Sequence, residues 1–268
     1  MTEAILKKIK QLPPLPESAM QIEAVYQDPN SSFNDMVKIL DKDPLLTADI
    51  LKAANSPLYG FSREINAISQ AVGLFGMGTV RGFALASIIK KCFVLELSPY
   101  GMNSEMFSAL SKKQHALIIS WCLRTENRLL GVLSPAAFLV EIGKALIAQQ
   151  VIADKKVETF KDDINELGDV EAAEKEIVGV DTPEVSATIF SEWKFDETLV
   201  DVIRNCQNPE NAKTEDDKKA ASILQVVRVA VPMNGKITDE SISAAKELIE
   251  KYGLNMQSFD TAIERIQE

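Results

Sequence analysis

Residues 43–60 read DPLLTADILKAANSPLYG, and their pattern predicts a short capped helix followed by a sharp turn. Asp43 can accept hydrogen bonds from the free N–H groups of a helix, and Pro44 suits the first helical position. Apolar residues then recur at helical spacing at Leu46, Ile50, Leu51 and Ala54. The helix should end at Asn55, because Pro57 disfavours the α conformation for Ser56 and the two polar side chains can bond local backbone.

Four spaced motifs resemble the HDOD family (HD-related output domain) of bacterial signalling proteins. They lie in the family's order at residues 12–16 (LPPLP), 43–47 (DPLLT), 54–60 (ANSPLYG) and 65–76 (INAISQAVGLFG). The similarity is strongest over about residues 12–95 and continues more weakly to about residue 210. Seven positions carry the signature and are expected to be structural: Asp43, Pro44, Asn55, Ser56, Pro57, Tyr59 and Gly60. The resemblance implies an all-α, HD-domain-like multi-helix bundle, a degenerate and non-catalytic relative of the HD and HD-GYP phosphohydrolases.

Composition favours a globular cytoplasmic protein of one large domain or two smaller ones. Of the 268 residues, 46% are hydrophobic, which is enough for a buried core, and no apolar run approaches the roughly 18 residues that cross a bilayer. The N-terminus lacks the apolar core of a signal peptide. Three widely spaced cysteines, an odd number, suit free thiols in a reducing compartment.

The net charge of −10 is carried entirely by the second part of the chain. Residues 1–97 contain ten basic and ten acidic side chains, whereas residues 98–268 contain nineteen basic and twenty-nine acidic ones. Binding to nucleic acid or to an anionic membrane usually needs a basic surface. We therefore expect no nucleic-acid partner and no membrane insertion, and a solvated role for most acidic side chains.

Helical patterns recur along the chain, and strand-like alternation does not. The turn cluster at residues 98–101 is the predicted boundary between an N-terminal signature subdomain (1–97) and a C-terminal HD-like subdomain (98–268). One continuous unit over about residues 12–210 with a helical C-terminal extension is the alternative. One long helix is predicted to begin at Ser134-Pro135 and continue through Ile147, and short, partly exposed helices are predicted in the acidic residues 154–181.

The HD phosphohydrolases hold divalent metals with several histidines and an adjacent His-Asp pair, but this chain has one histidine, His115. Residues 137–144 (AFLVEIGK) resemble the family's GLLHDIGK helix, with Val140 at the His position and Glu141 at the Asp position. By the same resemblance Thr182 replaces a second histidine. Cys206 and Gln207 stand where two more would be, and His115 aligns with the family's first histidine. The resemblance therefore implies no bound metal, no cofactor, no catalytic residue and no enzyme activity.

Other catalytic readings are weaker. His115 and Cys122 are seven residues apart on one predicted helix, too far for a direct hydrogen bond, and lone buried thiols are more often core residues than nucleophiles. Glu141 could act as a general base, but it could equally cap a helix, pair with Lys144 or face solvent. The glycine-rich residues 73–78 fit no phosphate-binding spacing and predict a tight turn between helices. The helix after that turn offers only Arg81, Lys90 and Lys91 for reading DNA.

The expected function is a non-catalytic regulatory module that acts through contacts with signalling proteins. The alternative is a sensor that binds a nucleotide or other small molecule without hydrolysing it. Its pocket would be lined by the degenerate positions His115, Val140, Glu141, Thr182, Cys206 and Gln207.

Overall fold

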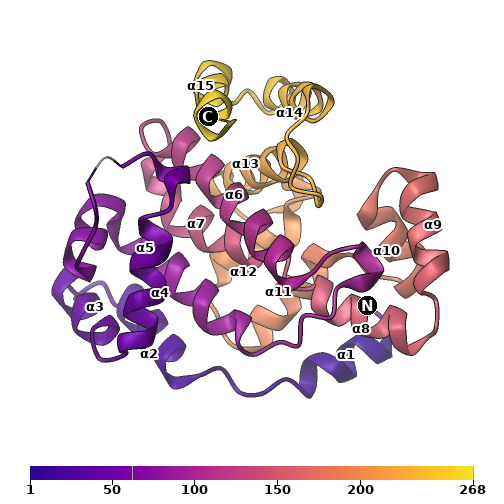
Figure 1. Ribbon diagram of the computed structural model, residues 1–268, viewed down its shortest axis with the longest axis horizontal. Coiled ribbons are helices and arrows are strands. Elements are labelled where there is room, and N and C mark those ends of the chain that lie inside the picture. The colour runs from indigo at the N-terminus through magenta and orange to yellow at the C-terminus, as the bar shows by residue number, and fades with distance from the viewer. Residues whose placement is uncertain (62, 268) are drawn as a thin grey trace.

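The computed structural model describes residues 1–61 and 63–267 as helices joined by short turns (Figure 1), and this part of the chain contains no β-strand. The α-helices and 3₁₀ turns are, in chain order, α1 (Glu3–Lys10), α2 (Glu17–Gln27), α3 (Phe33–Leu40), α4 (Pro44–Ala54), η1 (Pro57–Tyr59), α5 (Ile68–Lys90), η2 (Ser98–Tyr100), α6 (Ser104–Cys122), η3 (Asn127–Leu129), α7 (Leu130–Leu139), α8 (Lys144–Ala153), α9 (Val157–Leu167), α10 (Val170–Val178), α11 (Thr182–Glu192), α12 (Glu197–Asn205), η4 (Pro209–Asn211), α13 (Glu215–Ala230), α14 (Asp239–Tyr252) and α15 (Met256–Gln267). The predicted all-α fold class is confirmed for these residues.

The core helices α5, α6 and α7 lie in the middle of the molecule, where α7 packs against both α5 and α6 (Figure 1). On one side α2, α3 and α4 cover α5, and on the other α12 and α13 pack against α7. The acidic segment forms α9 and α10 beside α8, and α15 packs on α6. The N-terminal α1 contacts α8 and α11, so the chain's first helix lies on helices of its second half. The boundary at residue 97 stays a prediction.

The helix predicted from residue 43 is α4. One carboxylate oxygen of Asp43 accepts hydrogen bonds from the N–H groups of Leu45 and Leu46, both at 3.0 Å, and Pro44 begins the helix. At the other end, Asn55 Nδ2 donates to the carbonyls of Leu51 (2.9 Å) and Ile65 (2.8 Å), and Asn55 Oδ1 accepts from the N–H of Ile65 (2.8 Å). Asn55 therefore ties the end of α4 to the segment that returns ten residues later.

The glycine-rich segment forms the predicted turn inside α5. Gly76 has a non-helical backbone conformation, with φ 80° and ψ 163°, so the helix α5 is kinked at this residue. This backbone region is open essentially to glycine alone. The segment therefore joins two helical arms of α5, residues 68–75 and residues 77–90.

The predicted helix from Ser134-Pro135 to Ile147 is wrong in both its start and its continuity. The helix α7 already begins at Leu130, so Pro135 lies in its interior, and a turn over residues 140–143 separates α7 from α8. A proline within a helix leaves the carbonyl four residues earlier without its usual donor. Here that carbonyl, of Gly131, accepts a hydrogen bond from Arg81 Nη1 at 3.3 Å. A side chain of α5 thus compensates for the proline, which local sequence could not reveal.

Two helical segments, Ile68–Lys90 and Asn127–Ala153, are long and apolar enough to span a membrane by length and composition. Of their most apolar windows, 61% and 89% is buried inside the structure. The core helices of a globular protein meet the same criterion. These segments are weak evidence for a membrane and are explained by the packing of α5, α7 and α8.

Candidate functional site

The turn between α7 and α8 presents the residues aligned with the His-Asp pair, and α11 holds it in place. Ser186 Oγ donates to the carbonyl of Val140 (2.7 Å) and accepts from the N–H of Gly143 (2.8 Å). A Cβ atom on Gly143 would stand 2.5 Å from the carbonyl oxygen of Thr182, so a glycine is required there. The backbone on either side of Glu141 is therefore fixed.

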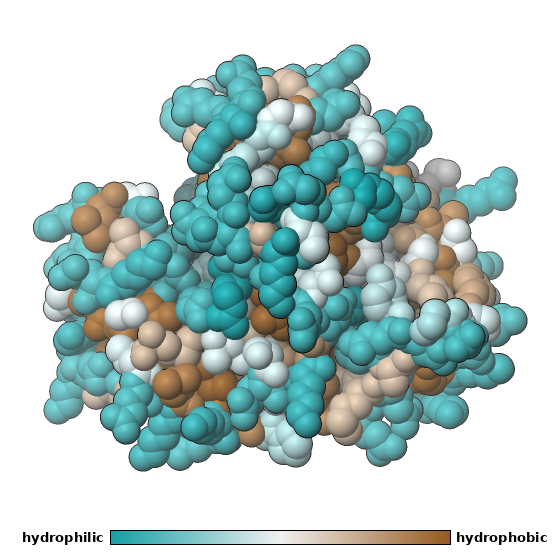
Figure 2. All heavy atoms as spheres, turned by 180° about the vertical axis from the view of Figure 1, so that it is seen from behind, coloured by the Kyte–Doolittle hydropathy of each residue, from teal (hydrophilic) through white to brown (hydrophobic). Residues whose placement is uncertain are grey.

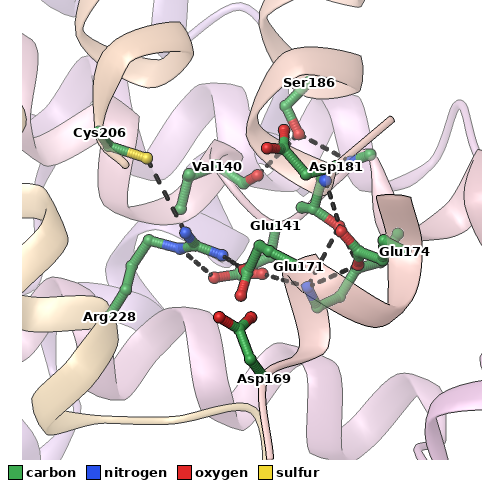
Figure 3. Close-up of polar contacts among 12 residues, drawn as sticks. Val140, Glu141, Asp169, Glu171, Glu174, Asp181, Ser186, Cys206 and Arg228 are labelled. Atoms are coloured by element: carbon green, nitrogen blue, oxygen red, sulfur yellow. Dashed lines mark hydrogen bonds and ion pairs between the residues drawn. The ribbon is translucent and has the colours of Figure 1, made fainter. Parts of the chain in front are cut away.

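Glu141 is buried and faces two cations (Figure 3). Its Oε1 accepts from Arg228 Nε of α13 at 2.7 Å, and its Oε2 lies 3.0 Å from Lys144 Nζ of α8. Gln114 Nε2 of α6 is 3.4 Å from the same Oε1 and donates to the carbonyl of Val231 at 3.1 Å. Three helices thus converge on one carboxylate, and only 3% of the surface of Glu141 stays exposed.

Each of these cations also binds a glutamate of α10. Arg228 Nη2 pairs with Glu171, and Lys144 Nζ lies 3.3 Å from Glu174. Glu174 accepts three further hydrogen bonds, from Tyr100 Oη (2.8 Å) and from both the N–H and the hydroxyl of Thr182 (2.6 Å each). We call Glu141, Lys144, Glu171, Glu174 and Arg228 the buried ion network.

Four charges of the network, those of Glu141, Glu171, Lys144 and Arg228, favour one another's ionised forms. Burial alone would raise the pKa of Glu141, but Arg228 and Lys144 outweigh burial and keep that pKa well below its usual range. Burial raises the pKa of Glu171 too, and Arg228 and Lys144 again reverse the direction. For Lys144 and Arg228, burial favours the neutral forms, yet the glutamates raise both pKa values. Burial raises the pKa of Glu174, with Lys144 opposing it.

This arrangement does not fit a divalent metal of the kind that the HD phosphohydrolases hold. Val140 has no lone pair on its side chain, and the Glu141 carboxylate already neutralises two cations. A divalent ion here would meet the positive charges of Lys144 and Arg228 directly. Within the described residues, no three His, Cys, Asp or Glu side chains are grouped as metal ligands would be. The positive charge that faces Glu141 comes from Arg228 and Lys144.

His115 is turned away from the network and is buried between α5, α6 and α7. A hydrogen bond of 2.6 Å joins its Nδ1 to Tyr59 Oη, and another of 2.7 Å joins its Nε2 to Ser134 Oγ. The ring stacks on Phe138 with centroids 4.1 Å apart. Burial lowers the pKa of His115 to about 3, so the ring is neutral, with one nitrogen donating and the other accepting. Both nitrogens are therefore engaged, and the signature residue Tyr59 accounts for one of them.

The remaining predicted positions are distributed around the network. Thr182 belongs to it through Glu174, and Cys206 Sγ lies 3.9 Å from Arg228 Nη1. Burial raises the pKa of Cys206 to about 12, which leaves a thiol and no nucleophilic thiolate at neutral pH. The pKa of the buried Cys122 is raised for the same reason. Gln207 is half-buried, and its carbonyl accepts from Gln225 Nε2 at 3.1 Å.

Sequence reasoning singled out Glu141 and named pairing with Lys144 as one of three possible roles for it, but missed Arg228, Glu171 and Glu174. A signal for Arg228 existed, since it follows Leu224 by four residues on the same apolar face of α13. A charged residue on a core-facing stripe needs a buried partner. Glu174 gave no such signal, because it lies in the acidic residues 154–181, which are predicted to form short, partly exposed helices.

A family model described as the HDOD domain matches residues 12–209. A crystal structure of a Shewanella amazonensis SB2B protein, provisionally named a phosphohydrolase, is 25% identical with a TM-score of 0.74, and the alignment covers 99% of this chain and 94% of that one. An HDOD domain protein from Geobacter sulfurreducens is 18% identical with a TM-score of 0.72, over 97% and 90% of the two chains.

Among curated sequences, an uncharacterized protein of Treponema pallidum (strain Nichols) is 29% identical over 77 residues. That alignment covers 29% of this chain, and the chain spans only 15% of the relative's length.

Proposed function

Because the chain belongs to the HDOD family, we propose that it is a non-catalytic regulatory module that acts by binding other proteins of a bacterial signalling pathway. The observation that carries this proposal is the pairing of Glu141 with Arg228 and Lys144 at the position of the metal-binding pair. Metal-assisted hydrolysis needs a metal-bound water as nucleophile. The network offers cations with fixed partners where that metal would lie.

Exposed apolar side chains support a role in protein contacts. Figure 2 shows hydrophobic residues scattered on a mainly hydrophilic face. Large apolar side chains remain exposed on or beside several N-terminal helices, among them Met20, Phe33, Leu45, Phe61 and Leu74. Leu45, which follows Pro44 in the signature, is 74% exposed. Aromatic residues and methionine are enriched in protein interfaces. A cytoplasmic location belongs to the same proposal and is supported by the free state of all three cysteines.

The proposal is tested by crosslinking the tagged full chain in a native bacterial host and then reconstituting each captured complex from purified proteins. We expect at least one signalling protein to bind with a defined stoichiometry. Leu45→Glu should weaken that binding without lowering the melting temperature, whereas Leu167→Glu, the same change on the exposed face of α9, should leave it intact. The proposal fails if no captured protein binds in the purified system.

The sensor alternative finds less support at the degenerate positions. Glu141 is ion-paired with Arg228 and Lys144, the Thr182 hydroxyl donates to Glu174, and Val140 and Cys206 are fully buried. A ligand there would have to displace Arg228 or Lys144 from its partners. A nucleotide that nevertheless bound at this place would raise the melting temperature by mass action, and it would do so less in Thr182→Val.

A further inference from the structure

A cleft of about 450 Å³ lies between α4, the second arm of α5, the first half of α6 and the end of α7. This volume falls in the range of small-molecule sites. The cleft is distinct from the buried ion network, although Leu139 and Ile142, which flank Val140 and Glu141 in the sequence, line part of it.

The inner wall of the cleft is aromatic. Phe83, Phe107 and Phe138 all line it, and the ring centroids of Phe83 and Phe138 are 5.7 Å apart. These rings are themselves anchored, since Phe138 stacks on His115. A rigid aromatic wall suits a flat or branched apolar body of a ligand.

The rim of the cleft is basic, in a chain whose net charge is −10. Four lysines line the cleft, Lys52, Lys90, Lys91 and Lys112, against one acidic residue, Asp49. Asp49 is already engaged, because it accepts hydrogen bonds from Ser87 Oγ and from Lys91 Nζ (3.2 Å). Over residues 1–61 and 63–267, no carboxylate lies within 4.0 Å of the ammonium of Lys90 or Lys112.

Lys90, the last residue of α5, and Lys112 of α6 both line the cleft, and their charges repel each other. Burial and then the charge of Lys112 lower the pKa of Lys90, with Asp49 and Glu105 opposing both. An anion placed between the two lysines would relieve this repulsion and accept charge-assisted hydrogen bonds from both. The lysines therefore suit the charged end of a ligand, and the aromatic wall suits the apolar end of the same ligand.

We propose that this cleft binds a small amphipathic anion, with its aromatic or branched apolar body against Phe83, Phe107 and Phe138 and its carboxylate or phosphate group between Lys90 and Lys112. The site is independent of the protein contacts proposed above. It also differs in place from the degenerate HD positions, so a ligand here needs no change in the ion network.

The test uses 4-phenylbutyrate as a carboxylate probe, phenyl phosphate as a phosphate probe and 4-phenylbutanol as a neutral analogue. Binding to the full chain is followed by ¹H–¹⁵N NMR titration. We expect saturable shifts at cleft residues with at least one anionic probe, and about tenfold weaker binding in Lys90→Gln or Lys112→Gln. The probe with the higher affinity identifies the head group.

Lys42→Gln, which removes the same charge from an exposed lysine outside the cleft, should bind like the wild type. Ala86→Leu, which fills part of the cleft, should weaken binding of all three probes. The proposal is overturned if neither anion binds saturably, if both lysine variants bind like the wild type, or if 4-phenylbutanol binds as tightly as the anions.

Discussion

Asn55 shows why single polar residues of the signature have structural roles. Its amide group satisfies both backbone groups of Ile65, a residue that is 2% exposed, and also the Leu51 carbonyl near the end of α4. Buried backbone groups that lose their partners carry a full desolvation cost. The side chain therefore joins two segments that are ten residues apart through hydrogen bonds to their backbone.

We predict that Asn55→Ala lowers the free energy of unfolding by about 2 kcal/mol, because the N–H and carbonyl of Ile65 lose their partners together. Urea denaturation measures this change. Asn127→Ala is the matched control, since Asn127 is exposed and should cost less than about 0.5 kcal/mol. Equal effects of the two substitutions would contradict the role given to Asn55.

In the ion network, removing one partner of an ion pair should lower the free energy of unfolding more than replacing both partners with apolar residues. Arg228→Met removes one of the two cations that face Glu141 and the cation that pairs with Glu171, and we expect a loss of about 3–5 kcal/mol. Adding Glu141→Leu to that variant should recover part of the loss, because an apolar pair of similar volume can replace a buried ion pair. A double-mutant cycle in urea measures the coupling. Strictly additive losses would show that the two side chains do not interact energetically.

His115 gives a pH dependence that can be assigned to one residue, since it is the only histidine of the chain. Its pKa falls from an unfolded value of about 6.5 to about 3 in the fold, so only the unfolded chain binds the proton between these values. Its contribution to stability is complete above pH 6.5 and is lost as the pH falls toward 3.

We predict that the wild type loses about 2 kcal/mol more than His115→Gln between pH 7 and pH 5. Comparing the two proteins removes the contribution of Glu174, whose raised pKa has the opposite effect on the pH dependence. The His115 ring resonances of the wild type give a second measurement. They should not titrate above pH 5, and a midpoint near 6.5 would refute a buried neutral ring.

At the scale of elements, the kink in α5 depends on the backbone conformation of a single residue. Gly76 has a positive φ, and a Cβ atom added to it would meet no neighbouring atom within 4 Å, so its glycine is required by backbone conformation and not by space. We predict that Gly76→Ala costs about 1–3 kcal/mol. Gly73→Ala, in the same helix and equally unobstructed but without a positive φ, should instead stabilise by about 0.5–1 kcal/mol. Thermal or urea unfolding gives both values, and the same sign for both would contradict the kink.

Most elements could be predicted from local chemistry. The predicted cap at Asp43 is set by neighbours within four residues, and the structure confirms it. The start of α7 could not be predicted in this way. Pro135 is a good helix start by local rules, and it is tolerated inside α7 only because Arg81, 50 residues from Gly131, bonds the freed carbonyl. Local rules fail where a distant side chain satisfies the backbone.

At the scale of the whole molecule, local rules also fail to predict which residues pair in the candidate site. The alignment with HD proteins located Val140 and Glu141, but the partner Arg228 is 87 residues from Glu141, and Tyr59 is 56 residues from His115. Such pairs are created by the packing of α6, α7 and α13, and no spacing in the chain encodes them. The sequence alone shows that the chain has one histidine and that Val140 and Glu141 stand at the positions of the His-Asp pair. The partners of Glu141 could be found only in the structure.

The most direct test of this account is an assay of metal-dependent hydrolysis by the purified full chain, with Mn²⁺ and a cyclic dinucleotide as substrate. We predict no turnover above the rate of Mn²⁺ alone, and no difference between the wild type and Glu141→Gln. Turnover that requires both the protein and Mn²⁺, and that Glu141→Gln abolishes, would contradict the proposal that this chain is a non-catalytic module.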